Sequence, residues 1–133
     1  MLLKSTKRIL ASAVLAIGLS PAALHAQELT GTLAKISEAG EIVIGHRESS
    51  VPFAYLNDNQ EPVGYSIDLC MKVVEEVEKT IGKEIDIRYV PVNPKTRIAL
   101  MANGTIDLEC GSTTNNLTRQ QQVEYLPTTF VTG

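Results

Sequence analysis

Positive charge is scarce in this 133-residue chain, which has 12 Lys and Arg against 15 Asp and Glu. Three of the cations, Lys4, Lys7 and Arg8, lie within residues 1–26, so the rest of the chain has a net charge of −6. A surface of that sign repels polyanions. The composition therefore argues against nucleic acid as a partner, and any arginine that binds a small anion must act locally.

Catalytic motifs are also lacking. The chain has no Gly-x-Ser-x-Gly turn and no pattern of paired catalytic carboxylates. His46 lies near Glu48, Ser49 and Ser50, which could suggest acid–base or nucleophilic chemistry. Neighbours on a strand point to opposite faces, however, so His46 and Arg47 cannot both face one cleft without a twist. We therefore predict a protein that is not an enzyme and that needs no cofactor.

Cysteine is limited to Cys70 and Cys110. Together with His46 they show no spacing typical of metal ligands, so we predict no metal site. Two cysteines suit an oxidising compartment, in which they could form a disulfide. The alternative is a pair of buried free thiols, because cysteine packs well as a small apolar side chain. We favour the free thiols.

An apolar run long enough to span a bilayer is missing, but residues 9–19 form a shorter one. It follows the cations of the N-terminus and precedes a cleavage site after Ala26. This pattern predicts a signal peptide over residues 1–26. No cysteine lies near its end, so we expect an exported, soluble product without a membrane anchor. Residues 27–133 suffice for one small domain.

Helical and strand patterns alternate along that domain, and no internal repeat interrupts them. Apolar residues at helical spacing predict a helix that begins at Ser66 as its N-cap and stops at Gly82. The other predicted elements are a helix over 32–39 closed by Gly40, a strand over 41–45, a hairpin over 52–65, a strand over 85–92, a helix over 94–103, a strand over 105–109 and an apolar strand over 129–131. This order predicts an α/β fold with a mostly parallel sheet flanked by helices.

Three arginines, Arg47, Arg97 and Arg119, each follow one of the predicted strands of the sheet. If the strands are parallel, their carboxyl ends share an edge, which is where open α/β sheets bind ligands. A planar guanidinium suits a carboxylate or a phosphate. Each arginine taken alone could be solvated, or paired locally as Arg47 with Glu48. Together they predict a site for a small anion.

The segment at residues 111–116 consists entirely of glycine, serine, threonine and asparagine. It lies between a predicted buried strand and Arg119. Such a segment can gather backbone N–H groups, hydroxyls and a guanidinium around one point, as a zwitterionic ligand requires. An ordinary polar turn that caps a helix near Thr118 is the alternative.

Several motifs resemble one known family. They are Gly-His-Arg-Glu-Ser-Ser at residues 45–50, Pro-Val-Gly-Tyr-Ser at 62–66 and Glu-Cys-Gly-Ser-Thr-Thr-Asn-Asn at 109–116. With the surrounding residues from 30 to 133 they are similar to the periplasmic glutamate/aspartate-binding proteins of ABC importers, within the wider family of polar amino-acid receptors. The resemblance implies a monomeric receptor of the type II periplasmic binding protein fold, which delivers L-glutamate or L-aspartate to a membrane permease.

The resemblance also implies a division of roles among the site residues. Arg119, helped by Thr114, would bind the α-carboxylate, and Ser112 would contribute polar contacts near the α-amino group. Arg47 and Arg97 would bind the side-chain carboxylate. Pro94 stands where relatives usually carry a serine, which could alter the preference between glutamate and aspartate.

Members of the resembled family continue into a second lobe, so the resemblance implies that residues 27–133 are a partial N-terminal lobe. Half a cleft covers only half of a ligand, and the lobe alone is expected to bind weakly. Two alternatives to a receptor remain: a truncated remnant that binds nothing, and a periplasmic enzyme similar to cyclohexadienyl dehydratases, which share the fold.

Overall fold

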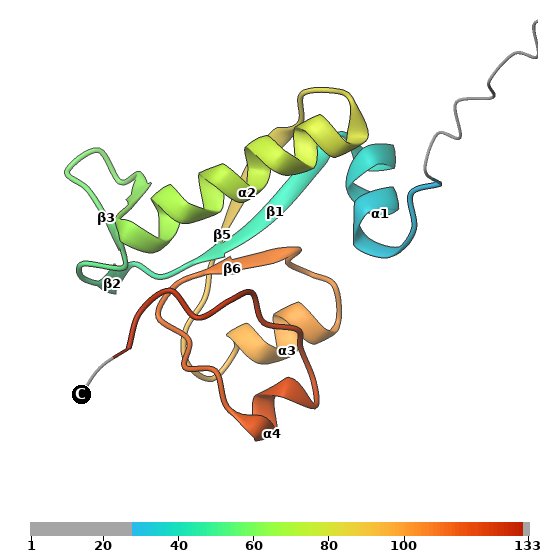
Figure 1. Cartoon of the computed structure of the whole chain (residues 1–133). Helices are drawn as coiled ribbons and strands as arrows, with labels where there is room; N and C mark the ends of the chain where they lie inside the picture. Colours follow the sequence, from blue (N-terminus) through green and yellow to red (C-terminus); the bar gives the residue numbers. More distant parts are fainter. Residues whose placement is uncertain (1–27, 132–133) are drawn as a thin grey trace, which may run out of the picture.

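The computed structural model describes residues 28–131, and the predicted signal peptide lies outside this range (Figure 1). The order of elements agrees with the alternation expected from the sequence. The elements are α1 (Gly31–Ala39), β1 (Glu41–His46), β2 (Ser49–Ser50), β3 (Ala54–Leu56), β4 (Pro62–Val63), α2 (Tyr65–Ile81), β5 (Asp86–Pro91), α3 (Arg97–Ala102), β6 (Leu108–Cys110) and α4 (Leu117–Gln120).

A three-stranded parallel sheet in the order β5-β1-β6 forms the centre of the domain. The apolar run at 42–44 occupies the middle strand, and both of its faces are buried. Ile42 and Ile44 pack in the cluster under α2, whereas Val43 packs with Val92 and Ile106 on the opposite face. Figure 1 shows α2 on one side of the sheet and α3 with α4 on the other. The predicted α/β class is confirmed.

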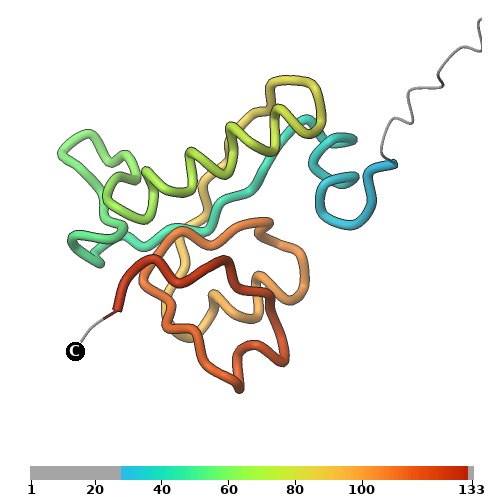
Figure 2. Tube along the Cα trace, viewed as in Figure 1, coloured from blue at the N-terminus to red at the C-terminus, as the bar shows by residue number. Residues whose placement is uncertain are grey.

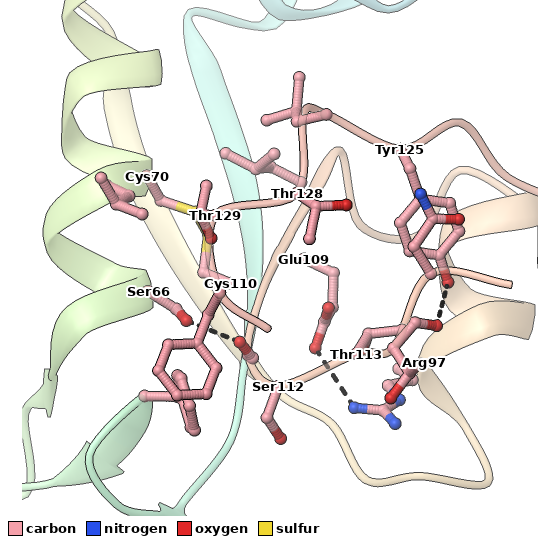
Figure 3. A pocket seen from close by; sticks show the side chains of 18 of the residues that line it. Ser66, Cys70, Arg97, Glu109, Cys110, Ser112, Thr113, Tyr125, Thr128 and Thr129 are labelled. Carbon is pink, nitrogen blue, oxygen red and sulfur yellow. Dashed lines mark hydrogen bonds and ion pairs between the residues drawn. A yellow bond between two sulfur atoms is a disulfide. The ribbon is translucent and has the colours of Figure 1, made fainter. Parts of the chain in front are cut away.

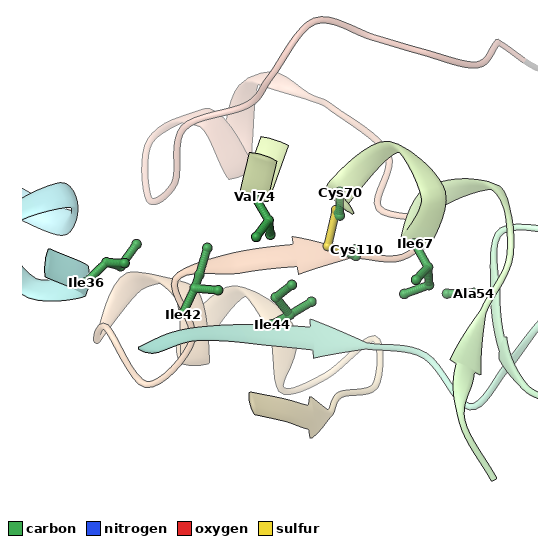
Figure 4. Close-up of a cluster of buried hydrophobic side chains, with 8 residues drawn as sticks. All are labelled: Ile36, Ile42, Ile44, Ala54, Ile67, Cys70, Val74 and Cys110. Atoms are coloured by element: carbon green, nitrogen blue, oxygen red, sulfur yellow. A yellow bond between two sulfur atoms is a disulfide. The ribbon is translucent and has the colours of Figure 1, made fainter. Parts of the chain in front are cut away.

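The longest helix, α2, covers the sheet with the apolar stripe that its sequence predicts. Ile67, Cys70 and Val74 are buried on this stripe and face Ile42 and Ile44 (Figure 4). Full burial of an aliphatic side chain contributes about 1.5–3 kcal/mol. The stripe therefore supplies a large part of the stability that holds α2 on the sheet.

The predicted N-cap of α2 is wrong. Gly64 precedes the helix with φ 122°, and no side chain caps it. A Cβ at Gly64 would lie 2.7 Å from the carbonyl oxygens of Pro52 and Phe53, so the tight approach to the hairpin requires glycine. Ser66 lies inside the first turn, and its hydroxyl donates a hydrogen bond to the carbonyl of Gly111 at 2.7 Å. The hydroxyl thus connects α2 to the polar segment instead of capping the helix.

Helix α3 is shorter than the predicted span of 94–103. Asn93 accepts hydrogen bonds through Oδ1 from the backbone N–H groups of Lys95 at 2.9 Å and Thr96 at 3.2 Å. This turn uses the residues that were expected to form the first helical turn, with Pro94 inside it. The helix consequently begins at Arg97. By contrast, α1 ends at Gly40 with φ 67°, as predicted.

The predicted hairpin is confirmed, because β3 pairs antiparallel with β4, and β2 adds to its other side. The predicted strand over 129–131 is not present. That segment runs back toward the hairpin (Figure 2), where Phe130 packs edge-on against Phe53 at a centroid distance of 5.0 Å. Tyr65 donates through its hydroxyl to the carbonyl of Thr129 at 2.9 Å. Side-chain contacts, not a strand ladder, therefore hold this segment.

Cys70 and Cys110 form a disulfide, so the favoured prediction of free thiols is wrong (Figure 4). Cys70 faces the sheet from α2, and Cys110 ends β6 on the same face. Their Cα atoms lie 6.2 Å apart, within the range that a disulfide spans. The bridge joins the main helix to the strand that leads into the polar segment 111–116.

Within residues 28–131, no helix combines the length and the apolar character that a bilayer crossing requires.

Candidate functional site

The carboxyl ends of the parallel strands carry the three arginines. Arg47 directly follows β1, Arg97 begins α3 after β5, and Arg119 lies in α4 after β6. Their charges act on one another: the pKa of Arg97 is lowered, first by burial, while Glu109 opposes the change and Arg119 and Arg47 add to it. The structure thus brings the three predicted arginines into one electrostatic cluster.

Arg97 is the most enclosed of the three, with 6% of its surface exposed. Its Nη1 lies 3.9 Å from Oε1 of Glu109, at the limit of an ion pair (Figure 3). Among the residues that the structure describes, neither Nε nor Nη1 of Arg97 has a hydrogen-bond partner. A cation at the start of a helix opposes the helix dipole. Glu109 supplies the compensating anion, and two donors remain free for a further acceptor.

Glu109 was not predicted as a site residue. It lies in β6 between Leu108 and Cys110, and its side chain is only 13% exposed. Burial raises the pKa of Glu109, while the hydroxyl of Thr113 and the charges of the three arginines act in the opposite direction. Oε1 of Glu109 has no hydrogen-bond partner of ordinary geometry in residues 28–131. A charged residue inside a short buried strand was the signal that could have identified it.

The polar segment turns around Arg119. Asn116 caps α4, because its Oδ1 accepts from the backbone N–H of Arg119 at 3.0 Å. The guanidinium of Arg119 donates through Nη1 to the carbonyl of Thr114 at 2.8 Å, and the Tyr125 hydroxyl donates to the same carbonyl at 3.3 Å. The expected helix-capping turn is therefore present, and the guanidinium of Arg119 bonds to the backbone of the polar segment.

A groove of about 700 Å³ opens beside these residues (Figure 3). Arg97, Ser112 and Thr114 line it, and the chain from Val123 to Val131 forms the facing wall. Ser112 and Thr114 are exposed, so their hydroxyls are accessible to a ligand. Arg47 and Arg119 do not line the groove. Of the five predicted site residues, three therefore line the groove and two do not.

Arg47, which directly follows β1, lies close to Gly111. Its Cγ would lie 3.0 Å from a Cβ built on Gly111, and Oε1 of Glu109 would lie 2.3 Å from that Cβ. The aliphatic part of Arg47 and the carboxylate of Glu109 therefore flank the backbone of Gly111 closely. A side chain at residue 111 would therefore force the carboxylate of Glu109 to shift.

His46 lies away from this cluster. It is 5% exposed, its ring packs edge-on against Tyr89 at 5.8 Å, and its Nδ1 lies 3.3 Å from the carbonyl oxygen of Arg47. In the register, His46 pairs with Cys110 and Gly45 pairs with Glu109, so His46 and Glu109 face opposite sides of the sheet. His46 does not line the groove.

The chain is 47% identical over 131 residues to the glutamate/aspartate import solute-binding protein of Salmonella typhimurium. It is 50% identical over 127 residues to the L-glutamate/L-aspartate-binding protein of Pseudomonas aeruginosa. These matches cover 95% and 94% of this chain but 43% and 42% of the relatives, so the chain spans about two-fifths of their length.

Solved structures show the same fold at lower identity. The receptor for L-cysteine of Neisseria gonorrhoeae superimposes with a TM-score of 0.61 at 23% identity, covering 71% of this chain and 37% of that one. An ancestral cationic amino-acid solute-binding protein gives 0.60 at 22% identity, covering 68% and 37%. These neighbours have the predicted type II periplasmic binding protein fold. Residues 42–133 match the description "Bacterial extracellular solute-binding proteins, family 3", and the chain therefore belongs to that family.

Proposed function

We propose that this chain is the ligand-binding lobe of an extracytoplasmic receptor that captures L-glutamate or L-aspartate for an ABC importer. The observation that carries the proposal is the cluster of Arg47, Arg97 and Arg119 around Glu109 at the carboxyl edge of the sheet. The names of the two relatives described above point to the same ligands.

The charge balance supports an acidic ligand. The charges of three arginines act on one enclosed carboxylate, so the cluster has a local excess of positive charge in a chain that is acidic elsewhere. The unpaired donors of Arg97 require an acceptor, since a buried charged group without hydrogen bonds is destabilising. A carboxylate accepts from a guanidinium with matched planar geometry. An amino acid with two carboxylates would balance the excess positive charge of the arginines with both of its ends.

The five site residues divide between the two ends of such a ligand. Arg119 binds the α-carboxylate together with Thr114, and Ser112 contributes polar contacts near the α-ammonium. Arg47 and Arg97 bind the side-chain carboxylate. Pro94 lies in the turn just before Arg97, and we expect it to affect the preference between glutamate and aspartate.

Titration of the purified chain with L-glutamate, L-aspartate and L-glutamine, followed by NMR, tests the proposal. Arg119→Ala is expected to weaken all three ligands, whereas Arg97→Gln is expected to weaken the two acidic ligands selectively. Loss of one partner of a buried charge pair costs about 2–5 kcal/mol, so the affinity should fall at least about thirtyfold. Arg88→Ala is the matched control, because Arg88 lies on β5 but pairs with Glu41 at the surface.

Equal losses for glutamate and glutamine in Arg97→Gln would contradict the role given to Arg97. No response of the groove residues to any of the three amino acids, at millimolar concentration, would favour the alternative of a remnant that binds nothing. We further propose that the chain works as a monomer in the periplasm after removal of residues 1–26. There it releases its ligand unchanged to a membrane permease and catalyses no reaction.

A further inference from the structure

The carboxylate of Glu109 is enclosed by cations yet incompletely bonded. It lies 3.9 Å from the nearest guanidinium nitrogen of Arg97, which is longer than a hydrogen bond, and its Oε1 has no other partner in the described part of the chain. Its side chain is 13% exposed, and that of Arg97 is 7% exposed. Water therefore compensates this pair poorly, and each group depends on the charges packed around it.

The positive charges that act on Glu109 come from three other parts of the fold. The charges of Arg97 on α3, Arg47 after β1 and Arg119 on α4 lower the pKa of Glu109, and so does the hydroxyl of Thr113 on the polar segment. Tyr125 acts on Arg97 from the facing wall. Glu124 lines the same groove but is exposed. Glu109 is thus an enclosed anion on which the charges of three arginines act.

Gly111 lies close to the carboxylate of Glu109. A Cβ at residue 111 would come within 2.3 Å of Oε1 of Glu109, so the backbone of the polar segment lies directly against the carboxylate. The segment itself is held by the Ser66 hydroxyl on the carbonyl of Gly111 and by the neighbouring disulfide of Cys110. The backbone of Gly111 therefore bounds one side of the Glu109 carboxylate.

We infer that Glu109 is a positioning residue for Arg97, and that its carboxylate takes up a proton from solvent when the carboxylate of an acidic ligand joins the arginine cluster. The inference rests on the proposed function and adds a proton linkage to it. Before binding, the negative charge of Glu109 holds the guanidinium in place. After binding, the ligand supplies that charge, and Glu109 becomes a neutral acid.

Two changes on binding favour the neutral form. The ligand carboxylate shares the arginine charges that stabilise the anion, and two carboxylates near one site raise the pKa of at least one of them. The ligand also covers the groove, which removes water from Glu109. Burial already raises the pKa of Glu109 in the free protein, so both changes act in the existing direction. In this step one O–H bond forms at the carboxylate, with the proton taken from solvent.

NMR titration of the side-chain carboxyl carbon over pH 4–8, with and without saturating L-glutamate, tests the inference. Glu109→Gln identifies the resonance by its disappearance and keeps the size of the side chain. The titration midpoint of Glu109 is expected to move to higher pH by about one unit, which corresponds to a tenfold fall in glutamate affinity as pH rises across the window. Glu109→Gln should abolish this pH dependence, and Glu124→Gln should preserve it.

The outcomes separate the two proposals. If L-glutamate perturbs the groove residues while the Glu109 midpoint stays in place or moves to lower pH, the proton linkage is wrong and the proposed function stands. If Glu109→Gln binds glutamate with an unchanged pH dependence, the linkage belongs to another group and the inference is also wrong. If glutamate and aspartate perturb nothing in the wild type, the proposed function fails, and the inference fails with it.

Discussion

Removal of the disulfide should cost much of the stability of this domain. The bridge joins Cys70 and Cys110 across 40 residues. In the chain-entropy description, closing a loop of that length lowers the entropy of the unfolded chain by about 13 cal/mol/K, or about 4 kcal/mol at 25 °C. Domains of this size have a free energy of unfolding of about 5–15 kcal/mol in total. The double variant Cys70→Ala/Cys110→Ala should therefore lose between about a quarter and four-fifths of the free energy of unfolding.

Urea denaturation, followed by circular dichroism, measures this cost directly. The free energy of unfolding should drop by about 4 kcal/mol in the double variant. The m-value should rise, because the unfolded chain without the bridge exposes more surface. Wild-type protein kept in reductant serves as a control for the packing lost with the two sulfur atoms, and should show a similar drop. A decrease below about 1 kcal/mol, with an unchanged m-value, would refute the reasoning from loop closure.

Three further substitutions test the geometry of the sheet edge. Gly111→Ala should push Glu109 and Arg47 away from the backbone and lower the affinity for L-glutamate in an NMR titration; unchanged affinity would contradict the close approach. Gly45→Ala would place a Cβ 2.6 Å from Cδ1 of the buried Ile106, so urea denaturation should show a loss of about 1–3 kcal/mol, and a neutral result would contradict the tight packing. The pKa of Glu109 is raised in the folded protein. The wild type should therefore lose stability relative to Glu109→Gln as pH rises from about 4.5 through the folded-state pKa. A difference in unfolding free energy that is constant from pH 4 to 8 would contradict this sign.

Elements with local signals were predictable from the sequence. The helical spacing of Ile67, Cys70 and Val74 identified the face of α2 that packs on the sheet. Gly40 marked the end of α1, and the apolar run at 42–44 marked a strand buried on both faces. The position of each arginine after a strand then followed from the parallel alternation, since carboxyl ends of parallel strands share an edge.

Features that depend on tertiary register were not predictable. The partner of Cys70 is set by the level at which β6 ends beneath α2, and no local pattern of the sequence encodes that level. The residue that precedes α2 is Gly64 and not the predicted Ser66, because the hairpin packs closely against the start of the helix. Glu109 was overlooked for the same reason: its importance arises from Arg97, a neighbour 12 residues away in the sequence that packs against it only in the folded chain.

The strand β6 links the stability of the domain to its proposed chemistry. Successive residues of a strand face opposite sides, so Cys110 bonds to α2 on one face while Glu109 meets Arg97 of α3 on the other. The next residue, Gly111, accepts the hydroxyl of Ser66 from α2 and leads into the polar segment. Helix α2 therefore holds the strand end at two successive residues. Because Glu109 lies directly before them, loss of the disulfide should disturb the arginine cluster as well as the fold.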